Sequence, residues 1–452
     1  MRFVAALCIA AVLALGALVH AAQVPALFSG DRPVSLRIRA SFDDLFARSS
    51  DSSYAVDGSI AYTGADGREV RVGAVSISVR GNTSKQDTEC TFPKLKVRFD
   101  SGSPSRTSMF AGVETFKIGT HCGEAPGERL TRKFGRLANE KAPLREVFVY
   151  RLLDIMGIPA LRARPAQITY EDADSRRPPL VRHAMLLEDS SEARQRLSLG
   201  SEIPMERFGS AAANLTVADT INLTFAEAMI GNFDWCLRLT PQDTYRCDAS
   251  KPLWNILAFE RDGDRDLPVL HDFDLSGMVT GSHNWFSKVL NVAFSATGSR
   301  PEVEVVSQLQ RTRTLFARGE LDAARRRFLK HRDAAFAALR ESDLDARGRE
   351  IITQYLTAFF DAIATDEAFY RPVTVQKTVA YAEGDGAAPA CGRAASVPVG
   401  TPVGPLLDRH GDRVRVVLLD ALWHWTGPRA CGAIRQGAVW ITADAIGTAF
   451  PP

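Results

Sequence analysis

Acidic and amide residues recur in the middle of the chain in an order that suits phosphoryl transfer. Asp234 follows an amphipathic segment, Asn255 comes next, and Asp272 follows an apolar pair with Asp274 close behind. A loop carboxylate can accept the proton of a substrate hydroxyl. An amide oxygen and further carboxylates are hard ligands of the kind that bind Mg²⁺ beside nucleotide phosphates. The pattern therefore indicates a kinase-type site.

Other interpretations of the same residues remain open. Asp and Asn are also common in turns and helix caps for purely local reasons. The pair His271-Asp272 would suit a metal-dependent phosphohydrolase, but that chemistry needs further histidines, and the eight in the chain are scattered. A hydrolase is disfavoured further because no Gly-x-Ser-x-Gly or His-Glu-x-x-His motif occurs. No Walker phosphate loop occurs either.

The surrounding pattern predicts which elements position these residues. Residues 33–100 alternate between apolar and polar in several short runs, which predicts a mostly antiparallel sheet. A helix is expected to begin near Pro143, and most of 200–370 has helical spacing. The Asp- and Asn-rich segment 230–290 is expected to form functional loops on this scaffold. Further predicted elements are strands at 94–99, 115–119, 166–170 and 183–188, and helices at 216–229, 303–316, 319–341 and 346–364.

The first residues have the layout of a secretory signal peptide. Arg2 precedes an apolar run over 3–19, and small residues follow, so cleavage is expected near Ala21 or Ala22. The alternative is an uncleaved N-terminal anchor. No later stretch is long and apolar enough to span a membrane, so a periplasmic or secreted protein without a transmembrane span is expected after cleavage. The net charge of +2 gives no reason to expect a nucleic-acid partner.

Six cysteines remain once Cys8 leaves with the signal peptide, and an even number in an exported chain predicts disulfides. Six cysteines allow about 15 pairings. Closeness in sequence favours Cys90–Cys122, Cys236–Cys247 and Cys391–Cys431. A zinc site is the less favoured alternative, because no Cys-x-x-Cys pair occurs.

Several short motifs, in order along the chain, resemble those of the spore-coat CotH kinase family and a related group of secreted bacterial proteins. The resemblance covers roughly residues 33 to 365. It rests on Arg80-Gly81-Asn82, on residues 90–95, 116–122, 144–150 and 185–189, on Gly231-Asn-Phe-Asp-Trp235, on Asn255-Ile256 and on His271-Asp-Phe-Asp274.

This resemblance implies an α+β chain with a two-lobed protein-kinase-like fold and an activity that needs Mg²⁺ and ATP. Lys117 would be the phosphate-contacting lysine, paired with Glu146. Its rivals are Lys94 and Lys96, which share one face of their strand, opposite Leu95 and Val97, because side chains alternate. Glu188, within 187–189, would belong to the linker that contacts the nucleotide base. Asp234 would be the base, with Asn255 and Asp272 as magnesium ligands and Asp274 orienting them or binding metal itself.

The resemblance also leaves room for a second kind of protein. Trp254 stands where the family has histidine, Lys94 replaces a proline, and residues 33–100 contain no evident glycine-rich nucleotide loop. The alternative is therefore a pseudokinase-like envelope protein that binds or scaffolds without transferring phosphate. As an enzyme, the chain would phosphorylate a protein or a small hydroxyl compound.

The tail from 371 to 452 resembles a bacterial SH3-like domain. It has short β runs at 373–381, 401–407, 413–419 and 438–442, which are typical of a small all-β barrel. Such a domain could bind peptidoglycan or an envelope protein through Trp423, Trp425 and Trp440; equally, these side chains could fill the barrel core. The predicted organisation is a signal peptide at 1–21, a β-rich N-lobe at 22–190, a helical C-lobe at 191–370 and the barrel at 371–452.

Overall fold

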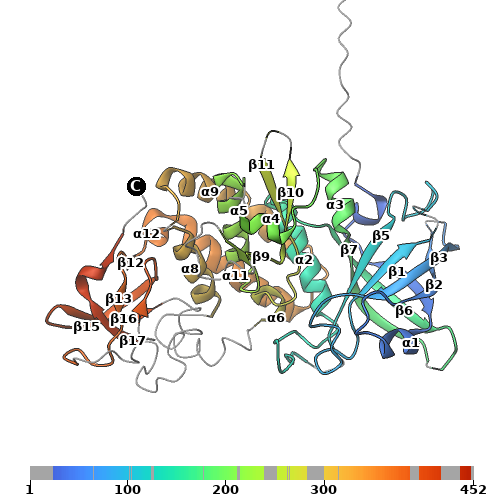
Figure 1. The fold of residues 1–452 in the computed structure, drawn as a ribbon, viewed down its shortest axis with the longest axis horizontal. Helices are drawn as coiled ribbons and strands as arrows, with labels where there is room; N and C mark the ends of the chain where they lie inside the picture. The colour runs from blue at the N-terminus through green and yellow to red at the C-terminus, as the bar shows by residue number, and fades with distance from the viewer. Residues whose placement is uncertain are drawn as a thin grey trace, which may run out of the picture.

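The computed structural model describes residues 24–64, 66–100, 102, 104–123, 127–176, 178–210, 214–238, 252–261, 263, 265–281, 300–313, 315–386, 396–418 and 438–448. Along the chain, a β-rich part is followed by a helical part and then by a smaller β part. They occupy the right, centre and left of Figure 1. The predicted mixture of a β-rich N-terminal part with helices is thereby confirmed.

The β-rich part is mostly antiparallel, as the sequence predicts, and it closes into a barrel, which the sequence does not predict. Its strand order is β1-β2-β3-β4-β5-β7-β6, and neighbours are antiparallel except β1 and β6, whose parallel pairing closes the barrel. The strands are β1 (Val34–Ala40), β2 (Ala55–Thr63), β3 (Glu69–Val79), β4 (Leu95–Phe99), β5 (Thr115–Thr120), β6 (Ala163–Asp172) and β7 (Leu180–Glu188). The short helices η1 (Ala26–Phe28) and α1 (Phe42–Ala47) accompany it.

Alternation along the strands separates an apolar interior from a polar outer face. On β4, Leu95 and Val97 are fully buried in the barrel, whereas Lys96 points outward with 43% of its side chain exposed. On β5, Phe116 and Ile118 are likewise fully buried. Lys117 lies between them in sequence, opposite Lys96 in the register of the two strands. The prediction that the lysines of this region lie opposite Leu95 and Val97 is confirmed.

One long helix, α2 (Ala142–Ile155), lies between the barrel and the helical part (Figure 1). Pro143 suits its first turn, where a missing N–H costs nothing. Both Leu152 and Leu153 are fully buried, because the helix packs against the barrel on one side and the helical part on the other. The helix thus places its side chains at the junction of the two parts.

The helical part has one core that runs from α2 through the later helices. Thr216 caps α5 by accepting a hydrogen bond from the backbone N–H of Asp219. The predicted helix 319–341 is divided at His331 into α9 and α10. The helices are α3 (Ser190–Arg196), α4 (Met205–Ser210), α5 (Val217–Met229), α6 (Gly277–Thr280), α8 (Arg300–Arg313), α9 (Arg318–Lys330), α10 (Arg332–Arg340), α11 (Ala346–Ala364) and α12 (Asp366–Phe369).

The tail has its own small apolar cluster, which includes Val403, Val416 and Ile441. Trp440 is half-buried there, whereas Trp423 and Trp425 lie outside the described residues. Its strands are β12 (Val373–Thr374), β13 (Thr378–Val379), β14 (Ser396–Val397), β15 (Val403–His410), β16 (Arg413–Leu418), β17 (Ala438–Thr442) and β18 (Ile446–Gly447), with η4 (Ala443–Ala445) between the last two. Among all the helices described, none has the length and apolar character needed to cross a membrane.

A disulfide joins Cys90 and Cys122, as the sequence predicts. It links the loop before β4 to the segment after β5, and the backbone N–H of Thr91 donates to the Cys122 carbonyl at 3.1 Å. Cys236 is also disulfide-bonded. Its predicted partner Cys247, and the predicted pair Cys391–Cys431, lie outside the described residues.

His121, beside this disulfide, is held in its neutral form. One ring nitrogen hydrogen-bonds the Gly123 carbonyl, and the other lies against the Arg182 guanidinium, which can donate to it but repels an added proton. Burial and the charge of Arg182 lower the pKa of His121 from 6.5 to about 4. The unfolded chain therefore binds a proton at this position at a higher pH than the folded chain does.

We expect the folded state to lose stability as the pH falls from 7 to 5, because protonation of His121 favours the unfolded chain in this window. A shift of this size corresponds to a loss of up to about 3 kcal/mol once the pH is below both pKa values. Urea unfolding at several pH values should show a shallower pH dependence for His121→Gln than for the wild type. The exposed His410→Gln serves as control; equal slopes for wild type and H121Q would contradict this assignment.

Candidate active site

Two hairpins bring the predicted acidic and amide residues together. In the first, β8 (Cys236–Leu237) pairs with β9 (Leu253–Trp254), so the chain just before β8 meets the chain just after β9. Asn255 accordingly donates from Nδ2 to Asp234 Oδ2 at 3.0 Å. In the second, β10 (Ile256–Arg261) pairs with β11 (Arg265–Leu270), which ends two residues before Asp272. Asp234, Asn255 and Asp272 therefore converge, as their order along the chain suggested.

Two of these residues have an uncommon backbone conformation. Asn255 has φ = 55° and Asp272 has φ = 65°; among the residues that the structure describes, the only other non-glycine residues with positive φ are Ser175 and Ser198. Asn and Asp tolerate this region better than most residues, and such conformations often cluster at functional sites. Asn255, directly before β10, and Asp272, two residues after β11, therefore share this uncommon conformation at neighbouring points of one hairpin.

The loop that carries Asp234 is fixed by a close approach at Gly231. This glycine has φ = +64°, and a Cβ there would lie 2.3 Å from the ring of Tyr355 on α11. Its carbonyl accepts the backbone N–H of Gly277 at 3.0 Å, which ties the loop to the segment that follows Asp274. Asn232 then accepts from the backbone N–H of Asp234 at 3.0 Å. Any side chain at 231 would displace the loop.

Helix α2 positions the segment that follows β11. Glu146 and Tyr150 lie one helical turn apart on the same face. Tyr150 Oη accepts the backbone N–H of Asp272 at 3.0 Å, and Glu146 Oε1 accepts that of Phe273 at 3.3 Å. The rings of Tyr150 and Phe273 also pack with their centroids 4.8 Å apart. Glu146 thus holds the backbone of the site, in addition to contributing charge.

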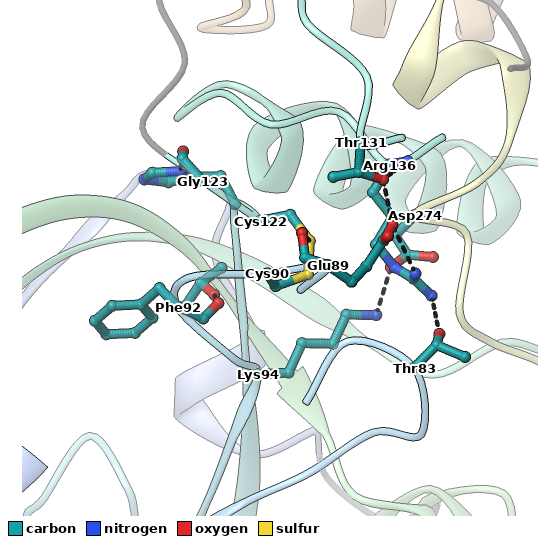
Figure 2. The surroundings of a disulfide bond; sticks show 12 residues. Thr83, Glu89, Cys90, Phe92, Lys94, Cys122, Gly123, Thr131, Arg136 and Asp274 are labelled. Atoms are coloured by element: carbon teal, nitrogen blue, oxygen red, sulfur yellow. Dashed lines mark hydrogen bonds and ion pairs between the residues drawn. A yellow bond between two sulfur atoms is a disulfide. The ribbon is translucent and has the colours of Figure 1, made fainter. Parts of the chain in front are cut away.

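Lys94 lies between Asp272 and Asp274, and Figure 2 shows its side chain extending toward Asp274. Its Nζ is 2.8 Å from Asp272 Oδ1 and 2.9 Å from Asp274 Oδ2, and only 8% of the side chain is exposed. Arg136 donates from Nε to Asp274 Oδ2 at 2.9 Å and from Nη2 to Thr83 at 2.8 Å, and its Nη1 lies 3.5 Å from Glu89. Lys94, directly before β4, and Arg136, in the segment between β5 and α2, therefore contribute two cations to the carboxylates of the helical part.

These ion pairs determine the charges of the site at neutral pH. Burial opposes ionisation of Lys94, but Asp272 and Asp274 outweigh it and raise its pKa. Burial likewise opposes ionisation of Asp272 and Asp274, but Lys94 prevails and the pKa of both is lowered. Burial raises the pKa of Glu146 to about 7, against the charge of Lys94. The lysine and both aspartates are thus charged at pH 7.

Asp234 has the protonation behaviour of a group that can take up a proton. Burial, Asp272 and Asp274 together raise its pKa to about 6. A carboxylate with a pKa slightly below the working pH is mostly ionised and still a useful base. Its side chain is partly exposed.

The other two predicted lysines form a separate cluster. Lys117 Nζ lies 3.4 Å and Lys96 Nζ 3.6 Å from Asp189 Oδ2. Burial lowers the pKa of Lys117, and Asp189 only partly offsets this. The structure pairs Lys117 with Asp189, whereas Glu146 interacts with Lys94. The lysine beside Glu146 is thus Lys94, and not Lys117 as predicted.

Glu188 is committed to internal contacts. Its carboxylate is fully buried and accepts from Arg196 Nε and Nη2, both at 2.8 Å, and from the backbone N–H of Arg162 at 3.0 Å. Its side chain therefore joins β7 to α3 and the start of β6. The Glu188 side chain is therefore not free to contact a nucleotide base.

The donor set suits a magnesium ion. Within the described ranges, His, Cys, Asp and Glu side chains form no cluster of three or more that could hold a metal. The predicted set instead combines an amide with two carboxylates. Among the described residues, Asp274 Oδ1 is buried without a hydrogen-bond partner, and the Asn255 side chain forms hydrogen bonds only through Nδ2. Asp272 keeps 31% of its side chain exposed. All three leave hard oxygen atoms free, as Mg²⁺ requires.

Sequence reasoning missed several residues of the site. Arg136, Thr83 and Glu89 lie outside the motifs, and their roles depend on contacts between distant segments. Tyr150 and Asp189 end the motifs 144–150 and 185–189, but neither the contact of Tyr150 with Asp272 nor that of Asp189 with Lys117 was predicted. One signal was available for Glu89, which precedes the predicted disulfide cysteine Cys90. Tyr150 could have been found because it lies four residues after Glu146 on a predicted helix.

No protein-family model matches the sequence, and no curated protein matches it. A crystal structure of the Helicobacter pylori proinflammatory kinase CtkA is similar over 60% of this chain and 89% of that chain, with 8% identity and a TM-score of 0.30. HipA, in a Shewanella oneidensis MR-1 toxin–antitoxin complex with HipB and operator DNA, matches over 60% and 62%, with 10% identity and a TM-score of 0.30. A TM-score this low does not establish a shared fold.

Proposed function

We propose that this chain is an exported CotH-like atypical kinase that transfers a phosphoryl group from Mg·ATP to a protein or a small hydroxyl compound. The observation that carries the proposal is the convergence of Asp234, Asn255, Asp272 and Asp274 with Lys94 at the junction of the barrel and the helical part. In this proposal the barrel and the helical part correspond to the two lobes of a kinase-like fold.

Each side chain has a role that its surroundings support. Asp234 accepts the proton of the acceptor hydroxyl, since its pKa is close to the working pH. Asn255, Asp272 and Asp274 would hold Mg²⁺, which neutralises charge on the transferred phosphoryl group. Lys94 keeps both aspartates ionised, and Glu146 and Tyr150 orient the backbone between them.

Export and the role of the tail belong to the same proposal. The Cys90–Cys122 disulfide supports an oxidising compartment, in agreement with the signal-peptide layout. The separate apolar cluster of the tail supports a domain of its own, which we propose to be SH3-like and to bind peptidoglycan or an envelope protein.

One observation favours the non-catalytic alternative. Lys94 and Arg136 already neutralise Asp272 and Asp274, so the carboxylates that would bind the metal are engaged in internal ion pairs. A pseudokinase-like envelope scaffold would keep such pairs permanently. The two candidates differ in whether Mg²⁺ and nucleotide bind at these residues.

Thermal unfolding with and without Mg²⁺ and ATP separates them. A ligand that binds only the folded state raises Tm, here by about 3 °C or more at saturating concentration. We expect this rise to require Mg²⁺ and to disappear in Asp272→Asn, while Asp57→Asn, an exposed residue on β2, retains it. No rise at millimolar ATP would overturn the kinase proposal in favour of the scaffold.

A further inference from the structure

Four cations lie on one outer face of the barrel. Lys96 on β4 pairs in register with Lys117 on β5 and with Ser78 on β3. Two residues further along this pair of strands, the backbone N–H of Arg80 donates to the Lys94 carbonyl at 2.9 Å, so Arg80 and Lys94 also lie side by side. Because side chains alternate, all four point away from the buried faces of β3, β4 and β5.

The four cations differ in how many carboxylates they pair with. Lys94 has Asp272 and Asp274, and Lys96 and Lys117 share Asp189. Arg80, although only partly exposed, makes no side-chain hydrogen bond or ion pair with any residue in the described ranges, and its Nε is buried. Like charges on neighbouring strands repel, and a buried guanidinium N–H without a partner is costly.

The position of Arg80 is fixed although its side chain is unpaired. Gly81 has φ = +96°, and a Cβ there would lie 2.3 Å from Ser84 Oγ, so the turn after β3 is tight. The charge of Arg80 lowers the pKa of Lys117, in addition to burial, and it contributes to the low pKa of Asp272 beside Lys94. Arg80 therefore lies within electrostatic reach of both the lysine cluster and the acidic cluster.

We infer that Arg80 binds a phosphate group and forms, with Lys117, a polyphosphate-binding surface on the outer face of the barrel. The planar guanidinium presents paired N–H donors that match phosphate oxygens, and Lys117 adds a second cation within electrostatic reach of it. Lys94 is paired with two aspartates, whereas the charge and the guanidinium N–H donors of Arg80 are not paired within the described residues. The inference rests on the proposed function, because the polyphosphate would be that of the nucleotide.

Calorimetric titration with inorganic tripolyphosphate, without metal, tests this surface directly. We expect Arg80→Gln to weaken tripolyphosphate binding by about tenfold or more, as expected for loss of a charged hydrogen bond, and Arg80→Lys to restore part of it. Arg71→Gln is the matched control. It removes the same charge from the same strand, about 30 Å away by strand geometry, where the side chain is 82% exposed.

The outcomes separate this inference from the proposed function. Unchanged tripolyphosphate binding by R80Q, with an unchanged thermal midpoint, would overturn the role of Arg80 even if Mg·ATP stabilises the chain. Loss of tripolyphosphate binding in R80Q but not in R71Q would support the surface even if Asp272→Asn shows that no Mg·ATP site exists. Equal losses in R80Q and R71Q would indicate general charge attraction and would also overturn it.

Discussion

Replacing Asp234 by asparagine is expected to lower the rate of phosphoryl transfer by about 10²- to 10⁴-fold, the usual contribution of a positioned general base. Asparagine has nearly the same shape, so Asn232 and Asn255 can still hold the loop. What disappears is the carboxylate that accepts the proton. The rate is measured as ADP release, with water or hydroxyl groups of the chain as acceptor.

Binding should separate this variant from the metal-ligand variants. Because Asp234→Asn keeps Asn255, Asp272 and Asp274, its thermal stabilisation by Mg·ATP should equal that of the wild type. Asp57→Asn should affect neither rate nor binding. Wild-type turnover in D234N would show that Asp234 is not the base, whatever else the site does.

Replacing Lys94 by methionine is expected to lower the free energy of unfolding by about 3–5 kcal/mol, the cost of removing one partner of a buried ion pair. Asp272 and Asp274 would then lie close together, with Arg136 still paired to Asp274. In the wild type, Lys94 outweighs the effect of burial on the two aspartates. Without Lys94, burial would raise the pKa of both and favour their protonation. The measurement is urea unfolding at pH 7, followed by intrinsic fluorescence.

Lys96 provides the matched control for Lys94. It lies two residues further along the same face, with 43% of its side chain exposed and a longer ion pair of 3.6 Å to Asp189. Lys96→Met should cost no more than about 1 kcal/mol. Adding Asp272→Asn to Lys94→Met should recover part of the loss, because the two residues are coupled. Equal effects of K94M and K96M would contradict the proposed role of Lys94.

The sequence identified the acidic side of the site better than the basic side. Asp234, Asn255 and Asp272 follow short apolar segments, so their residue type and position already predict side chains delivered at the ends of elements. Alternation along β4 correctly placed Lys94 and Lys96 on one face. The packing of α2 against the barrel determines which lysine lies near Glu146. No local sequence pattern predicts that packing.

Closure of the barrel was not predictable for a similar reason. The parallel pairing of β1 with β6 joins segments more than a hundred residues apart, and period-two patterns show strands but not their partners. Arg136 illustrates the same limit. It lies outside the regular elements, yet it joins Glu89 and Thr83 of the barrel to Asp274 of the helical part. The Cys90–Cys122 disulfide was predicted, because closeness in sequence favoured that pair.

The most direct test of the central claim is whether the purified chain produces ADP from Mg·ATP. The reaction is monitored by ³¹P NMR, and the Asp272→Asn variant is measured in parallel. The account predicts that the β- and γ-phosphate signals of ATP decline and that those of ADP appear, only with Mg²⁺ and only in the wild type. ADP formation at the same rate in Asp272→Asn, or none above that of ATP alone in the wild type, would contradict it.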